Sequence, residues 1–88
     1  MHLFEKIRTE IIDFANRSFG QVPDPGTISI GPTKKEFTGD VTIVVFPLVN
    51  LLRKSPVEIG GPIGEHLASK IAEVSTFNVV QGFLNLSL

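Results

Sequence analysis

The last twelve residues, FNVVQGFLNLSL at 77–88, constrain the fold more than any other segment of the chain. Apolar and other residues alternate on both sides of Gln81-Gly82, a pattern typical of two antiparallel strands joined by a tight two-residue turn. This register brings two pairs together on the core side of the hairpin, Val79 with Leu84 and Phe77 with Leu86. The sequence therefore predicts that the chain closes with a β-hairpin.

The same register places an aromatic ring on the outer side of the hairpin. There Val80 pairs with Phe83, and Asn78 pairs with Asn85. A strand with one buried face usually carries its aromatic residues on that face. Phe83 is therefore either a contact surface for a ligand or partner, or a ring that covers Val80 across the hairpin.

A second strong signal is SPVE at 55–58, in which Ser55 is an N-cap, Pro56 the first helical residue and Glu58 the partner in a capping box. The helix that begins there has an apolar stripe, formed by Ile59, Ile63, Leu67 and Ile71. The segment GGPIG at 60–64 interrupts it, and an internal proline costs about 3 kcal/mol relative to alanine. The sequence predicts a kink or a restart at Gly61-Pro62.

The first half of the chain predicts one helix and two strands. Residues 2–19 carry apolar side chains at steps of three and four, which is typical of an amphipathic helix, and Gly20 ends it. TISI at 27–30 and VTIVVF at 41–46 are expected to be strands joined by 31–40. Pro47 then opens a short helical stretch over 48–54.

The predicted order is helix, two strands, helix, two strands. This order is typical of a two-layer α+β fold, a four-stranded, mostly antiparallel sheet with its helices on one face. The other face is expected to be open. At 88 residues the chain is expected to be one domain, 1–88.

Composition excludes several classes of protein. Without cysteine, the chain has neither disulfides nor thiolate metal sites, and a reducing cytoplasm is the simplest location. The longest apolar stretch, at 41–52, is too short to span a bilayer, and charged residues interrupt the N-terminal segment where a signal peptide would be apolar. The formal net charge of −1 attracts no polyanion, so any nucleic-acid contact must be local.

Residues that carry catalytic chemistry are scarce. His2 and His66 are isolated and lack metal-ligand spacing, so each is interpreted as a surface or boundary residue. The glycines at 60–64 match neither a phosphate-binding loop nor a dinucleotide fingerprint. No catalytic residue, metal or cofactor is expected in this chain.

Two segments resemble a known family: PTKKEFTGDVTIVVFPLVNLLRKSPVEIGGPIGEHL at 32–67 and FNVVQGFLNLSL at 77–88. They are similar to the N-terminal additional domain of arginyl-tRNA synthetases, with the closing Gly-Phe-Leu-Asn at 82–85 as the most specific match. The resemblance implies a full-length cytoplasmic arginine–tRNA ligase that uses ATP with magnesium. Its catalytic domain, which carries the HIGH and KMSK motifs, is not in this chain, and the chain is expected to be an excised domain that begins at a natural Met1.

The resemblance also implies a partner and a site. In this family the domain touches the outer corner of tRNA and contacts a D-loop base, and the aromatic residue and the asparagine of the closing motif correspond to Phe83 and Asn85. An exposed ring can stack on an unpaired base, and an amide can hydrogen-bond the base edge. Candidate phosphate contacts are Lys34, Lys35, Arg53 and Lys54. The partners are then the tRNA for arginine and the domain's own catalytic domain.

The chain departs from the family pattern at the turn of the hairpin, where Gln81 replaces the usual proline, and in the capped helix, where GGPIG replaces an Ala- and Glu-rich segment. A second hypothesis is a protein-interaction or intrachain docking module that buries Phe83 and Val80 against a partner. A small enzyme that hydrolyses acyl phosphates is disfavoured, because no Arg and Asn pair is placed at an anion-binding loop.

Overall fold

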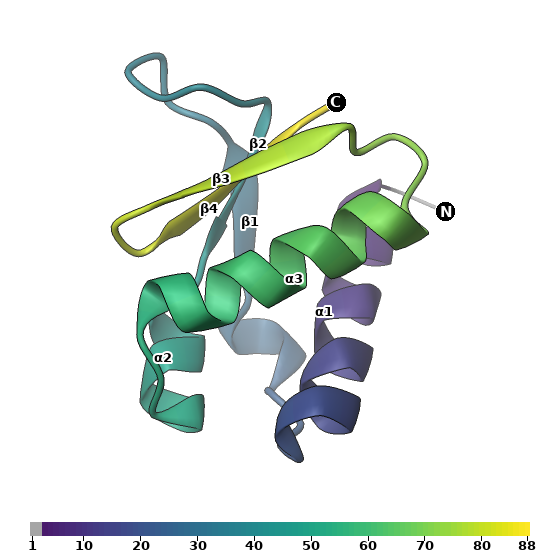
Figure 1. Ribbon diagram of the computed structural model, residues 1–88, viewed down its shortest axis with the longest axis vertical. Helices are drawn as coiled ribbons and strands as arrows, with labels where there is room; N and C mark the ends of the chain where they lie inside the picture. Colours follow the sequence, from purple (N-terminus) through teal and green to yellow (C-terminus); the bar gives the residue numbers. More distant parts are fainter. Residues whose placement is uncertain (1–2) are drawn as a thin grey trace.

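The computed structural model describes residues 3–88. In chain order the elements are α1 (Leu3–Phe19), the 3-10 helix η1 (Pro25–Thr27), β1 (Ser29–Pro32), β2 (Val41–Val44), α2 (Phe46–Leu52), α3 (Pro56–Lys70), β3 (Thr76–Val80) and β4 (Phe83–Ser87). The strands form one antiparallel sheet in the order β1-β2-β4-β3. Figure 1 shows the α-helices below the β3–β4 hairpin and the β1–β2 loop above it. The predicted α+β fold with helices on one face is confirmed.

The register of the closing hairpin is confirmed pair by pair. Val79 lies opposite Leu84 and Phe77 opposite Leu86, while Val80 lies opposite Phe83 and Asn78 opposite Asn85. Gln81 takes a φ of 53° in the turn, the left-handed region that tight hairpin turns require. The strand predicted at 27–30 begins later, at Ser29, and the strand predicted at 41–46 ends at Val44, just before α2 begins.

Helix α3 begins at the predicted capping box. The Glu58 N–H donates to Ser55 Oγ at 3.2 Å, and the Ser55 N–H donates to Glu58 Oε1 at 3.0 Å. This backbone hydrogen bond from Ser55 is the main reason that the pKa of the Glu58 carboxyl lies below its usual value. The cap fixes where the covering helix starts along the sheet.

Of the two predicted outcomes at Gly61-Pro62, the restart is wrong, since α3 continues through Pro62 to Lys70; the kink stays a prediction. Pro62 lies on the exposed side of α3, so water can bind the carbonyl that its missing N–H leaves free. The opposite side buries three large side chains completely, those of Ile59, Ile63 and Leu67. At roughly 1.5 to 3 kcal/mol each, their burial exceeds the ~3 kcal/mol cost of one internal proline.

The core lies between the helices and the inner face of the sheet. Its fully buried side chains come from α1, α2, α3, β2 and β4, and the largest of them are Ile7, Ile11, Ile43, Leu48, Ile59, Ile63, Leu67, Leu84 and Leu86. On the solvent side of α1, Arg17 pairs with Asp13 at 2.8 Å. None of the helices among residues 3–88 is long and apolar enough to cross a bilayer.

Candidate functional site

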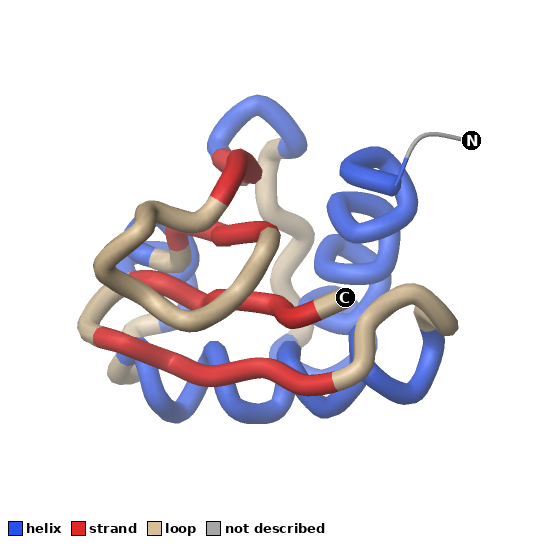
Figure 2. The backbone as a smooth tube through the Cα atoms, turned by 90° about the horizontal axis from the view of Figure 1, so that it is seen from above, coloured by secondary structure: helices blue, strands red, loops and turns tan. Residues whose placement is uncertain are grey.

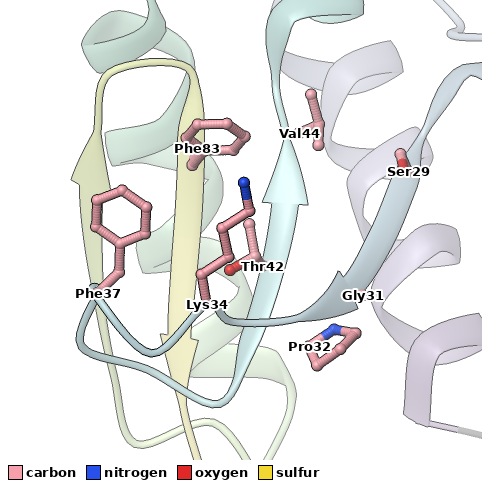
Figure 3. Close-up of a pocket in the computed structure, with 8 residues that line it drawn as sticks. All are labelled: Ser29, Gly31, Pro32, Lys34, Phe37, Thr42, Val44 and Phe83. Atoms are coloured by element: carbon pink, nitrogen blue, oxygen red, sulfur yellow. The ribbon is translucent and has the colours of Figure 1, made fainter.

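A pocket of about 170 Å³ opens on the face of the sheet that the helices leave uncovered. It is lined by Ser29, Gly31, Pro32, Lys34, Phe37, Thr42, Val44 and Phe83. Figure 3 shows Phe83 and Phe37 on one side of it, the backbone of β1 on the other, and Lys34 reaching in between. The pocket is smaller than the ~300 to 1,000 Å³ of sites for drug-sized ligands, so it suits one ring of a larger ligand.

Phe83 lies at the centre of a row of three aromatic rings. Its centroid is 6.2 Å from that of Phe37, at an interplanar angle of 35°, and 6.2 Å from that of Phe46, at 81°. Phe83 is half-buried, and Phe46 is 51% exposed. The row, Phe37, Phe83 and Phe46, therefore combines a supported ring with an accessible apolar surface, as stacking on a base requires.

The position of Phe46 depends on the turn of the hairpin. The Val45 N–H donates to the Gly82 carbonyl at 2.9 Å, which ties the start of α2 to this turn. A Cβ added at Gly82 would lie 2.3 Å from ring atoms of Phe46. The glycine of the closing motif is thus required for the close approach of this ring.

Asn85, the second predicted base contact, is not exposed. Its side chain has 0% exposure. Thr42 Oγ1 donates to Asn85 Oδ1 at 2.6 Å, and Asn85 Nδ2 donates to Asn78 Oδ1 at 3.1 Å. The prediction that Asn85 faces water on an open sheet is therefore wrong, and its amide is not accessible to a base edge in this arrangement.

The loop between β1 and β2, residues 33–40, covers Asn85. Figure 2 shows the loop passing over β2 and β4. It is tied at one end because the hydroxyls of Thr33 and Thr42 are 2.9 Å apart, and at the other because Asn78 Nδ2 donates to the Thr38 carbonyl at 2.8 Å. We call these five residues the polar ladder: Thr33, Thr38, Thr42, Asn78 and Asn85. The ladder holds the loop that carries Lys34 and Phe37.

Of the four predicted basic residues, only one lines the pocket together with Phe83. Lys34 lines the pocket and is the only charged residue among its lining residues in the described chain. Lys35 is exposed in the same loop but does not line the pocket. Arg53, with a φ of 56°, is the C-cap residue that follows α2, and Lys54 comes next; both are exposed and lie outside the pocket lining.

His66 lies away from this pocket and does not line it. His66 Nε2 lies 2.8 Å from Glu10 Oε1 between α1 and α3, with its ring 4.8 Å from that of Phe14. His66 is therefore a boundary residue, whereas His2 lies outside the described residues. Residues 3–88 contain no group of three or more His, Cys, Asp or Glu side chains placed to hold a metal ion.

Sequence reasoning missed Phe37, Phe46 and Gly31. One signal for Phe37 was available, because it is the only aromatic residue in the polar segment KKEFTGD. The sequence pattern predicts Phe46 at the end of a strand, whereas in the structure it begins α2. No local pattern places either ring beside Phe83, since both contacts depend on the folded sheet.

Comparison with known proteins gives a consistent result. The family model described as "Arginyl tRNA synthetase N terminal domain" matches residues 2–88. The arginine–tRNA ligase of Bacteroides fragilis is 36% identical over 88 residues, which is 100% of this chain and 15% of that protein. The arginine–tRNA ligase of Porphyromonas gingivalis is 39% identical over 88 residues, with the same coverage.

A solved structure shares the fold. Thermus thermophilus arginyl-tRNA synthetase superposes with a TM-score of 0.75 at 23% identity, over 99% of this chain and 14% of that chain. This chain therefore spans about 15% of the length of the curated relatives it matches.

Proposed function

The chain belongs to the family of arginyl-tRNA synthetase N-terminal domains, and from this we propose that it recognises the tRNA for arginine by contacting an unpaired D-loop base at the outer corner. It is a non-catalytic part of such a ligase. The ATP- and magnesium-dependent transfer of arginine, in the cytoplasm, then belongs to the part of the relatives that this chain does not match.

The pocket beside Phe83 is the observation that supports this proposal most directly. A half-buried ring held between Phe37 and Phe46 offers a rigid stacking surface, and stacking contributes about 1 to 3 kcal/mol per base. Lys34, which lines the same pocket, can contact the phosphate beside that base. An aromatic surface next to one cation suits a nucleotide in a single-stranded loop.

The role proposed for Asn85 differs from a direct base contact. Because its amide is buried and bonded to Thr42 and Asn78, we propose that it supports the loop of Lys34 and Phe37. Its effect on tRNA would then be indirect, through the shape of the pocket.

The experiment is a titration of a fluorescently labelled tRNA transcript for arginine with the 88-residue chain. With a net charge of −1 and one small contact area, the chain should bind no tighter than about 10 µM at physiological salt. Phe83→Ala should weaken binding by roughly 1 to 3 kcal/mol. Phe83→Leu is the matched control, because it keeps apolar volume but removes the stacking face, and it should lose nearly as much.

A transcript with an abasic D-loop position tests the base itself. It should bind the wild-type chain as weakly as the intact transcript binds Phe83→Ala. Equal binding of the intact and abasic transcripts by the wild-type chain would contradict the proposal.

The exposure of Phe46 favours a second candidate, an apolar docking surface for the rest of a synthetase. Salt distinguishes the two candidates, because phosphate contacts weaken steeply with ionic strength whereas apolar docking does not. Binding of the transcript that is unchanged between low and high salt would favour docking.

A further inference from the structure

Neither a steric contact nor the backbone conformation requires a glycine at residue 31. It is the third residue of β1, opposite Thr42 of β2. Glycine within a strand weakens it, because the chain loses more conformational entropy on folding and has no side chain to pack. A glycine at such a position therefore calls for a compensating role.

Several other glycines of the chain have visible structural reasons, although Gly61, within α3, resembles Gly31 in having none. A Cβ at Gly64 would lie 2.3 Å from the Phe77 ring, and one at Gly82 would lie 2.3 Å from the Phe46 ring. Gly39 has a φ of +142°, which other residues rarely adopt. Gly31 has no such positive φ, and a Cβ added to it would meet nothing within 4 Å.

The space in front of Gly31 is the pocket. Gly31 lines it together with Thr42 and Val44 of β2 and Phe83 of β4. Figure 3 shows Gly31 on the β1 side of the pocket, across from the two aromatic rings. A Cβ at residue 31 would therefore occupy pocket volume without contacting any neighbour.

We infer that Gly31 is a specificity-determining position, at which the missing side chain lets the edge of an unpaired base lie against the backbone of β1 while its face meets Phe83. Glycine in a strand often marks a site where a ligand approaches the backbone closely. The pocket of about 170 Å³ has little room to spare, so even one or two methyl groups would compete with the base. This inference rests on the proposed function.

The test compares Gly31→Ala and Gly31→Val in titrations with the intact and abasic tRNA transcripts. Gly31→Val should weaken binding of the intact transcript by roughly tenfold or more, and Gly31→Ala by a smaller factor, as expected for methyl groups placed in a tight pocket. Both variants should bind the abasic transcript as the wild-type chain does. Both should unfold at or above the wild-type melting temperature, since the added side chain favours the strand.

Gly26→Ala is the matched control. It adds the same methyl group at an exposed glycine outside the pocket, where the new Cβ would make an ordinary contact of 3.6 Å with Asp24. It should leave binding unchanged. If Gly31→Val unfolds, Gly31→Ala alone decides the matter, because a single methyl group meets no atom of the fold.

The outcomes separate this inference from the proposed function. If both Gly31 variants bind the intact transcript like the wild type while Phe83→Ala loses binding, the role of Gly31 is refuted and the base-recognition function stands. If the wild-type chain binds the intact and abasic transcripts equally, the proposed function fails and this inference fails with it.

Discussion

The inner face of the sheet, under α1 and α3, is made of apolar side chains in close contact, whereas the outer face combines the polar ladder with an aromatic-lined pocket. On the inner face Gly64 lets α3 approach the Phe77 ring so closely that a Cβ there would clash at 2.3 Å. On the outer face the loop 33–40 is held by hydrogen bonds and leaves a cavity open. The side chains of the inner face stabilise the fold, whereas those of the outer face position groups for a ligand.

The contrast also separates what sequence patterns specify. Burial of apolar surface is not directional, so the inner face needs only the correct period of side chains along each element. The outer face depends on a few hydrogen bonds between residues far apart in the chain, such as the bond between Asn78 and Thr38. Substitutions on the two faces should therefore fail in different ways.

The largest effect is expected on the inner face. Leu86 has 0% exposure and belongs to the core, so Leu86→Ala should lower the free energy of unfolding by about 2 to 5 kcal/mol through lost burial and a cavity. Ser87→Ala, next to it on the half-buried outer side, should change stability by less than about 0.5 kcal/mol. Urea denaturation of both variants measures this difference, and similar losses for the two would show that the faces do not differ as described.

The hairpin register could be predicted because its cause is local. A two-residue turn at Gln81-Gly82 pairs Val79 and Phe77 with Leu84 and Leu86 on one side of the hairpin, and the structure has that pairing. The same holds for the capping box at Ser55 and Glu58. In both cases the residues that decide the structure are close in sequence.

The failed predictions share a different cause. The local cost of Pro62 predicts that α3 can restart there, yet burial of the opposite side of the helix outweighs that cost. The alternation of β4 predicts an exposed Asn85, yet a loop more than 40 residues earlier in the chain covers it. Tertiary contacts determine both the continuity of α3 and the burial of Asn85, and a periodic sequence pattern does not reveal such contacts.

A smaller effect than that of Leu86→Ala is expected for the centre of the polar ladder. Asn85→Ala should lower the free energy of unfolding by about 1 to 3 kcal/mol, because it removes one of the two partners of the half-buried Thr42 hydroxyl and the donor to the amide oxygen of Asn78. Hydrogen exchange should also show faster opening of the amides in the loop 33–40. Thermal or urea unfolding gives the first quantity.

A double-mutant cycle with Asn78→Ala controls for general damage. Because the two amides bond directly, the double variant should be more stable than the sum of the two single losses implies, by about 0.5 kcal/mol or more. Additive losses would mean that the ladder does not act as a unit, and an Asn85→Ala chain as stable as the wild type would leave Asn85 free to serve as a direct base contact.

The smallest effect is expected for two adjacent lysines of the outer face. Lys34 lines the pocket, whereas Lys35, its neighbour in the same loop, does not. If Lys34 contacts a phosphate beside the bound base, Lys34→Ala should reduce by about one the magnitude of the slope of log affinity against log salt concentration. Lys35→Ala removes the same charge from the chain, so it corrects for the change in net charge and should leave this slope nearly unchanged.

Both lysines are exposed, so neither change should affect stability by more than about 0.5 kcal/mol. Titrations of the tRNA transcript at several salt concentrations give the two slopes. Equal slopes for the two variants would show that the loop contributes only a diffuse positive charge, and that the outer face positions the aromatic rings but no specific phosphate contact.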